Sequence, residues 1–166
     1  MRYALLASIV MSAYACASHQ EEIVQEIFDY ISTDTELAAT YRLNTSFAQQ
    51  IIQLPYTISS SGFYTLGTSL QGATQSGGTG ITISADNVIL HLNNQTLSNR
   101  TNGISFSSRT NIYIANGSLQ NMLSSGISIV GSSRNIVLEN ITFNNSAAGI
   151  ISIGTNILGV KNEIHF

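Results

Sequence analysis

The chain is poor in charged residues, cysteine and proline. Only 9% of its 166 residues are charged, six Lys and Arg against nine Asp and Glu, whereas about 25% is usual. Without a basic field, the chain does not suit nucleic acid as a partner. The single cysteine, Cys16, excludes a disulfide framework and a cysteine zinc cluster. Low charge together with 43% hydrophobic residues excludes a disordered chain, which combines high charge with few aliphatic residues.

Small, uncharged polar residues are abundant in place of charged residues, and they are unevenly distributed along the chain. Ser, Thr and Asn number 53. All thirteen glycines follow residue 61, fourteen of the fifteen asparagines follow residue 80, and the one proline, Pro55, stands near this border. The length fits one domain, or one domain with a small appendage. The change in composition predicts a boundary near Pro55, with alternating β segments after it.

The N-terminal segment, residues 1–17, has the pattern of a targeting sequence. Arg2 precedes an apolar run, and Ala15-Cys16-Ala17 fits a small-x-small cleavage site. The run is shorter than the about 20 apolar residues that span a membrane. We expect a signal peptide at residues 1–17 and a protein that is secreted or located in the cell envelope. The alternatives are a buried N-terminal helix and lipidation at Cys16, where Ala13 replaces the Leu that the bacterial lipobox prefers.

Residues 18–54 predict an acidic helical segment. It opens with the spacing of a helix capping box, and six of the nine acids lie between residues 18 and 36. Aliphatic residues recur at helical spacing, at Ile23, Ile27 and Ile31. We interpret the acids as a solvated helix face, because nothing makes them converge on a metal. Further short helices are expected up to Leu54, and the segment is a candidate N-terminal cap for the region that follows.

Three short motifs recur at a nearly constant interval from residue 80 onward. Gly-Ile pairs begin at evenly spaced positions, Gly80, Gly103, Gly126 and Gly149. The other two motifs begin with asparagine, one at Asn87, Asn111 and Asn135, the other at Asn94, Asn116 and Asn140. Each motif carries too few inward aliphatic residues for a core of its own, so coils must stack at about 4.8 Å to bury one. A fixed period of about 23 residues predicts a solenoid, here a parallel β-helix with three strands per coil.

Three stretches carry a family resemblance: residues 54–66, 80–83 and 87–93. They are similar to the opening of secreted right-handed parallel β-helix proteins of the pectate-lyase-like superfold, although relatives often have Asp in place of His91 and Gly in place of Asn94. The resemblance implies an all-β solenoid over residues 55–166, long enough for four to five coils. That superfold hosts polysaccharide lyases, glycoside hydrolases, epimerases, adhesins and phage tailspikes, so the fold leaves the function open.

The repeated asparagines also produce apparent glycosylation motifs. Asn-x-Ser/Thr occurs at Asn44, Asn94, Asn99, Asn116, Asn140 and Asn144. Three of these belong to the third repeat motif. Asparagine at the corner of a coil tolerates left-handed backbone angles, and stacked asparagines can hydrogen-bond along the axis. We therefore interpret the repeated asparagines, including Asn87, Asn111 and Asn135, as structural ladders.

The residues that alternate with the inward aliphatics of the second motif point outward. They bring five chemically active side chains to one face, which is the candidate binding site: Asp86, His91, Tyr113, Arg134 and Glu139. His91 and Glu139 would lie two coils apart, roughly 10 Å. Asp86 and Glu139 stand in different columns, and the coils hold no acid cluster that could give calcium its six to eight oxygen ligands. We identify no catalytic residue, metal site or cofactor, and expect this face to be mainly a solvated sheet surface.

Two functions are compatible with this pattern. The first is a secreted or envelope-associated module without catalysis that acts as a scaffold or binds a polysaccharide or a cell-surface partner. The second is a polysaccharide lyase or glycoside hydrolase, or a fragment of one. Residues 162–166 still alternate like a strand, with no capping element after them. Because solenoids need end caps, we expect either a longer native chain or end-to-end association through the last coil.

Overall fold

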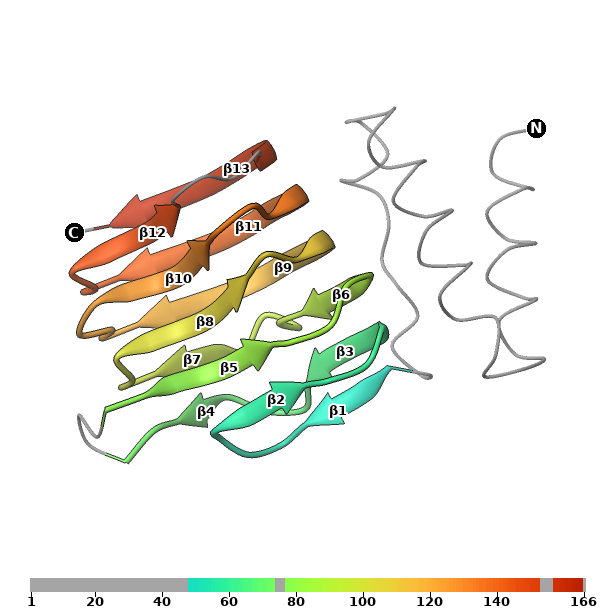
Figure 1. Cartoon of the computed structure of the whole chain (residues 1–166). Coiled ribbons are helices and arrows are strands. Elements are labelled where there is room, and N and C mark those ends of the chain that lie inside the picture. The colour runs from blue at the N-terminus through green and yellow to red at the C-terminus, as the bar shows by residue number, and fades with distance from the viewer. Residues whose placement is uncertain (1–47, 74–76, 153–156, 166) are drawn as a thin grey trace, which may run out of the picture. The chain divides into compact units, whose positions relative to one another are not determined.

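The chain folds into an all-β parallel solenoid of about four turns (Figure 1). The computed structural model describes residues 48–73, 77–152 and 157–165, the last range by its backbone. The predicted fold class is confirmed over these residues. The expected signal peptide and acidic helices lie outside them. No helix able to cross a membrane occurs in the described part of the chain.

The described residues form two parallel sheets that run along the solenoid (Figure 1). Sheet A has eight strands: β1 (Gln49–Ile51), β3 (Gly62–Leu66), β4 (Leu70–Gln71), β6 (Val88–His91), β7 (Thr96–Ser98), β9 (Thr110–Gln120), β11 (Arg134–Asn144) and β13 (Ile157–His165). Sheet B has five: β2 (Tyr56–Ile58), β5 (Thr79–Ile83), β8 (Asn102–Ser107), β10 (Ser125–Val130) and β12 (Ala148–Ser152). In the early coils the second and third motifs are separate strands. In β9 and β11 they join into one long strand.

The register of the strands reproduces the sequence repeat. In sheet B, Ile81, Ile104, Ile127 and Ile150 pair in succession. In sheet A, Val88 pairs with Ile112, and Ile112 pairs with Ile136. Each coil therefore places like residues on like residues, as the constant spacing predicts.

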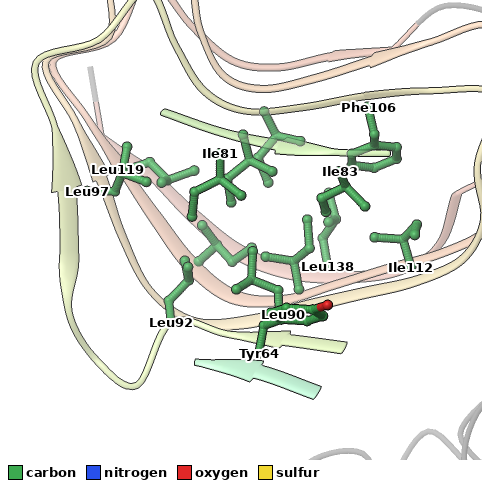
Figure 2. Packing of buried hydrophobic residues seen from close by; sticks show 14 of the residues in the cluster. Tyr64, Ile81, Ile83, Leu90, Leu92, Leu97, Phe106, Ile112, Leu119 and Leu138 are labelled. Carbon is green, nitrogen blue, oxygen red and sulfur yellow. The ribbon is translucent and has the colours of Figure 1, made fainter. Parts of the chain in front are cut away.

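The hydrophobic core is a column of aliphatic side chains between the sheets (Figure 2). Ile81 and Ile83 come from sheet B. They face Leu90, which lies in β6, and Leu92, which directly follows β6. Ile81, Leu90 and Leu92 are fully buried. Burial of each such side chain contributes about 1.5–3 kcal/mol, and stacking joins the few inward residues of each coil into one continuous core.

The Gly-Ile motif is explained by a close approach between coils. A Cβ atom on Gly80, Gly103 or Gly126 would lie 2.8, 2.6 or 2.8 Å from the carbonyl oxygen of the corresponding glycine in the next coil. Real Cβ atoms do not approach an oxygen so closely. These three coils consequently need glycine at this position, which explains the constant spacing of the motif, whereas the coil of β2 has Pro55 there.

Asparagine ladders occupy the corners of the coils. Asn111 donates from Nδ2 to Asn87 Oδ1 at 2.7 Å, and Asn135 donates to Asn111 at 2.9 Å. A second ladder joins Asn140 and Asn116 at 3.0 Å. All of these residues have positive φ, between 50° and 58°, the left-handed region that asparagine tolerates better than most residues. The structural interpretation of these asparagines is confirmed.

A further asparagine ladder was not predicted. Asn145 donates to Asn121 at 2.8 Å. Asn99 holds the same corner one coil earlier, also with positive φ. Because the step from Asn99 to Asn121 is shorter than the step from Asn121 to Asn145, this series is less regular than the others and is harder to see in the sequence.

The solenoid begins earlier than the composition predicts. Gln49–Ile51 form β1, which pairs in parallel with Tyr64–Leu66 of β3. The expectation of helix up to Leu54 is therefore wrong for this strand. Ile51 is fully buried in the core, and its burial determines the local structure although no Gly or Asn motif precedes it.

Candidate functional site

The five candidate residues lie on or beside β6, β9 and β11, as predicted. His91, Ala115 and Glu139 occupy one register column. Tyr113 stands in the adjacent column, between Ile89 and Val137. Arg134 pairs with Thr110 at the start of the strands, and the Asp86 carboxylate accepts a hydrogen bond from the Thr110 backbone N–H at 2.9 Å. The register therefore contains the predicted outward columns.

The face is less solvated than expected. Ile89 is 1% exposed, Tyr113 4% and Glu139 7%, and Ala115 is fully buried. Ile89 and Tyr113 share a register column with Phe63, so three large side chains follow each other at the strand spacing of about 4.8 Å. These residues point away from the core cluster, yet they are as buried as the core.

The Tyr113 hydroxyl donates a hydrogen bond to Glu139 Oε2 at 2.7 Å, between neighbouring coils. Burial raises the pKa of Tyr113, and the hydrogen bond to Glu139 and its charge raise it further. The phenol consequently stays protonated and remains a donor. A buried carboxylate needs such a donor, because an unpaired charge away from water is costly.

His91 uses both of its ring nitrogens. Nδ1 accepts a hydrogen bond from the Asn93 backbone N–H at 3.0 Å, and Nε2 lies 2.7 Å from the Asn116 side-chain amide. Burial lowers the pKa of His91, while the charge of Glu139 acts in the opposite direction. His91 therefore closes one end of the Asn116–Asn140 ladder.

Asp86 has a structural partner, Arg109, that the repeat pattern does not predict. Arg109 Nη1 lies 3.9 Å from Asp86 Oδ1 and donates to the Ser84 carbonyl at 3.0 Å. Its Nε donates to the Ser107 carbonyl, also at 3.0 Å. Arg109 thereby bridges two coils at the turns. Arg134, by contrast, is exposed.

A further cation, Arg100, lies outside these columns. Arg100 is 7% exposed and donates from Nη2 to the Thr79 carbonyl at 3.1 Å, while its Nε has no hydrogen-bond partner among the described residues. By backbone register, Lys161 of β13 takes the position next to Glu139. The two residues are about one coil apart in the sequence, but the register shifts between β11 and β13 make this pairing hard to predict.

The chemistry of the face is limited. Within the described ranges, no three His, Cys, Asp or Glu side chains gather where they could hold a metal ion. Asp86 accepts from a backbone amide, Glu139 from a phenol, and His91 lies between an amide N–H and an asparagine. Each of these groups is hydrogen-bonded to the solenoid itself, which suits a structural role better than proton transfer to a substrate.

Sheet B presents a second face of a different kind. Its outward positions carry a rank of hydroxyl groups in successive coils, at Thr57, Thr82, Ser105 and Ser128. A parallel rank stands two positions along each strand, at Ser59, Ser84 and Ser107. Neighbours lie about 4.8 Å apart across the strands and about 6.6 Å apart along them. None of these positions carries a charge, so we call this surface the hydroxyl face.

Comparison of the chain with protein-family models, curated proteins and solved structures finds no match. The parallel β-solenoid is therefore established by its register and its burial pattern, and the site must be interpreted from its own geometry.

Proposed function

We propose that the chain is a non-catalytic solenoid module that binds carbohydrate or a cell surface outside the cytoplasm. The observation that carries this proposal is the 2.7 Å hydrogen bond from Tyr113 to Glu139. This bond pairs the buried Glu139 carboxylate with another side chain of the solenoid. A catalytic acid or base would instead have to face the substrate. The likeness to the pectate-lyase-like superfold and the expected signal peptide favour the same function, because that superfold includes adhesins and a signal peptide directs export.

The hydroxyl face is the surface best suited to such binding. Its ranks contain no charged residue, although the Arg109 guanidinium contacts the Ser84 and Ser107 carbonyls. They run parallel to the solenoid axis through Thr82, Ser105 and Ser128. Hydroxyl groups both donate and accept hydrogen bonds, so a rank of them can pair with the hydroxyls of a neutral polysaccharide lying along the axis. Parallel strands fix the spacing of the rank, which limits the entropy lost on binding.

A glycan array followed by affinity measurement with the full-length protein tests this proposal. We expect binding to neutral linear polysaccharides that Ser105→Lys weakens about tenfold, equivalent to about 1.4 kcal/mol, because the ammonium group would have to be desolvated. Ser118→Lys is the matched control, since Ser118 stands between Thr96 and Thr142 in an outward column of sheet A. An array and a cell-surface pull-down that both yield no ligand would count against a binding function.

A polysaccharide lyase or glycoside hydrolase is the second candidate. It is favoured by the register, which places a base, His91, and an acid, Glu139, in one column two coils apart. Incubation of the purified protein with polysaccharides would then release unsaturated uronides or new reducing ends. If Glu139→Ala or Asp86→Ala abolished that release while Ser118→Ala retained it, catalysis would replace binding as the better interpretation.

A further inference from the structure

His91 stands at the C-terminal end of β6, where the chain turns toward β7. The turn is tight, with Asn93 and Asn94 both at positive φ, 55° and 57°. The Gln95 N–H donates to the Leu92 carbonyl at 2.8 Å. Within this turn, the Asn93 N–H donates to His91 Nδ1 at 3.0 Å. The imidazole is therefore part of the turn that joins two faces of the coil.

The hydrogen bond from Asn93 determines which ring nitrogen holds the proton. A nitrogen that accepts a hydrogen bond carries no proton, so in neutral His91 the proton lies on Nε2, which becomes a donor. Nε2 lies 2.7 Å from the Asn116 side-chain amide, and a donor there requires the amide oxygen. Oxygen and nitrogen of an asparagine amide are assigned from such networks. Asn116 consequently directs Oδ1 to His91 and Nδ2 to Asn140.

This assignment gives the Asn116–Asn140 ladder a direction of its own. In the Asn87 ladder, each later asparagine donates to the preceding coil. The 3.0 Å contact of this ladder pairs Asn140 Nδ2 with Asn116 Oδ1. Binding of Asn116 Oδ1 to His91 therefore requires the amides of both asparagines to be turned over, and the hydrogen bond between them then runs the opposite way. The direction of the second ladder is thus set by the histidine at its end.

The surroundings of His91 provide few charges to stabilise a cation. It pairs with Thr65 on β3 and with Ala115 on β9, and Glu139 continues the same column on β11. The neutral phenol of Tyr113 belongs to the adjacent column. Glu139 is the one acid among these described neighbours, and it stands two register steps away with its Oε2 bound to Tyr113. Thr65 is buried and its hydroxyl has no hydrogen-bond partner among the described residues.

We propose that His91 is a pH-dependent latch on the β6–β7 turn: neutral, it holds the Asn93 backbone and orients the Asn116–Asn140 ladder, and protonated, it releases the Asn93 backbone while its Nε2–H still donates to Asn116. A proton on Nδ1 faces the Asn93 N–H, so two donors meet and the hydrogen bond is lost. The turn also contacts both adjacent coils, because Asn93 Nδ2 donates to the Leu66 carbonyl and Asn94 N–H to the Asn116 carbonyl. Its release loosens three coils at one corner.

Nitrogen-15 NMR of the full-length chain tests the latch directly. At neutral pH we expect the His91 proton on Nε2, and a pKa below the ordinary 6.5. As His91 becomes protonated, the protection of the Asn93 amide against hydrogen exchange should fall about fivefold, the effect of losing one ordinary hydrogen bond. A proton on Nδ1 at neutral pH, or Asn93 protection that does not follow the His91 titration, would overturn the proposal.

Asn116→Asp provides an independent test. A carboxylate next to Nε2 favours the charged imidazole, so the pKa of His91 should rise by about one pH unit in this variant. Aspartate tolerates the positive φ of this position, which keeps the fold intact. Asn135→Asp is the matched control, because it makes the same change in the Asn87 ladder, and the pKa of His91 should not move. Equal titration midpoints in the wild type and Asn116→Asp would contradict the contact on which the latch depends.

Discussion

Tyr113 and Glu139 lie on neighbouring coils, in adjacent register columns, and are joined by a 2.7 Å hydrogen bond from the phenol to the carboxylate. Both side chains are less than a tenth exposed. The pair crosses diagonally between two columns, so it links β9 to β11 through side chains on the outward face as well as through the backbone ladder.

Removal of the phenol hydroxyl should destabilise the fold more than neutralisation of the acid. Tyr113→Phe leaves a buried carboxylate without its donor, and we expect a loss of about 1–3 kcal/mol in the free energy of unfolding. Glu139→Gln keeps an acceptor oxygen for the phenol and should cost less. Urea denaturation of both variants and of the double variant measures this. Strictly additive losses would show that the two groups do not interact.

The contribution of the asparagine ladders to stability should have a backbone part and a side-chain part, which two variants can separate. Asn111 is buried, has a φ of 58° and bonds to asparagines in both adjacent coils. Asn111→Gly removes the amide but accepts the backbone angle, whereas Asn111→Ala also places a Cβ in the left-handed region at a cost of about 1–2 kcal/mol. We expect the alanine variant to unfold at lower denaturant concentration than the glycine variant. Identical midpoints would mean that the positive φ is not retained.

Replacement of a glycine of the Gly-Ile motif by alanine should destabilise the fold, whereas the same replacement at a glycine outside the motif should not. In Gly103→Ala the new methyl group would meet the Gly126 carbonyl oxygen at 2.6 Å, and overpacking of this kind costs about 1–3 kcal/mol or more. Gly77→Ala is the control, because its methyl group would meet only Thr101 Oγ1, at 3.7 Å, and surface changes stay within about 0.5 kcal/mol. Thermal unfolding of the two variants checks this. A Gly103→Ala melting temperature equal to that of Gly77→Ala would refute the close approach of the coils.

Stability should decline as the pH falls below the pKa of an ordinary histidine. The pKa of His91 is lower in the folded state than its ordinary value of 6.5, so the unfolded chain binds the proton more readily. Its contribution to stability is complete above pH 6.5 and is lost as the pH falls from there toward the folded pKa. The difference in unfolding free energy between wild type and His91→Gln, measured across this window, isolates the effect from the other histidines. A difference that is constant with pH would exclude it.

The sequence is sufficient to predict the parts of the fold that repeat by translation. Gly103 and Asn111 recur because each coil must satisfy the same contact with the next, and the constant spacing of these contacts makes them visible. The diagonal hydrogen bond between Tyr113 and Glu139 is not predictable in this way, because it occurs in one pair of coils and joins different columns. The same is true of Gln49–Ile51, whose strand is determined by the burial of Ile51 and carries no repeat motif.

The candidate face illustrates the same limit. Its five residues are placed by alternation alone, and the structure brings them to the predicted strands. Their exposure and partners depend on neighbours of other kinds, such as Ala115, which leaves Glu139 and His91 without a bulky residue between them. The sequence period predicts on which strand and face a side chain lies. The size and shape of its neighbours determine its exposure and its hydrogen-bond partners.

The glycine column has a consequence for how such a chain can change in length. Because Gly80, Gly103 and Gly126 occupy equivalent positions, removal of the whole segment from one glycine up to the next joins two sites with the same backbone geometry. Insertion of a whole coil does the same. A short deletion within a coil would instead move the glycine and the corner asparagines out of line with their neighbours. The solenoid is therefore able to lengthen or shorten by complete coils. Insertions or deletions of part of a coil are confined to its turns.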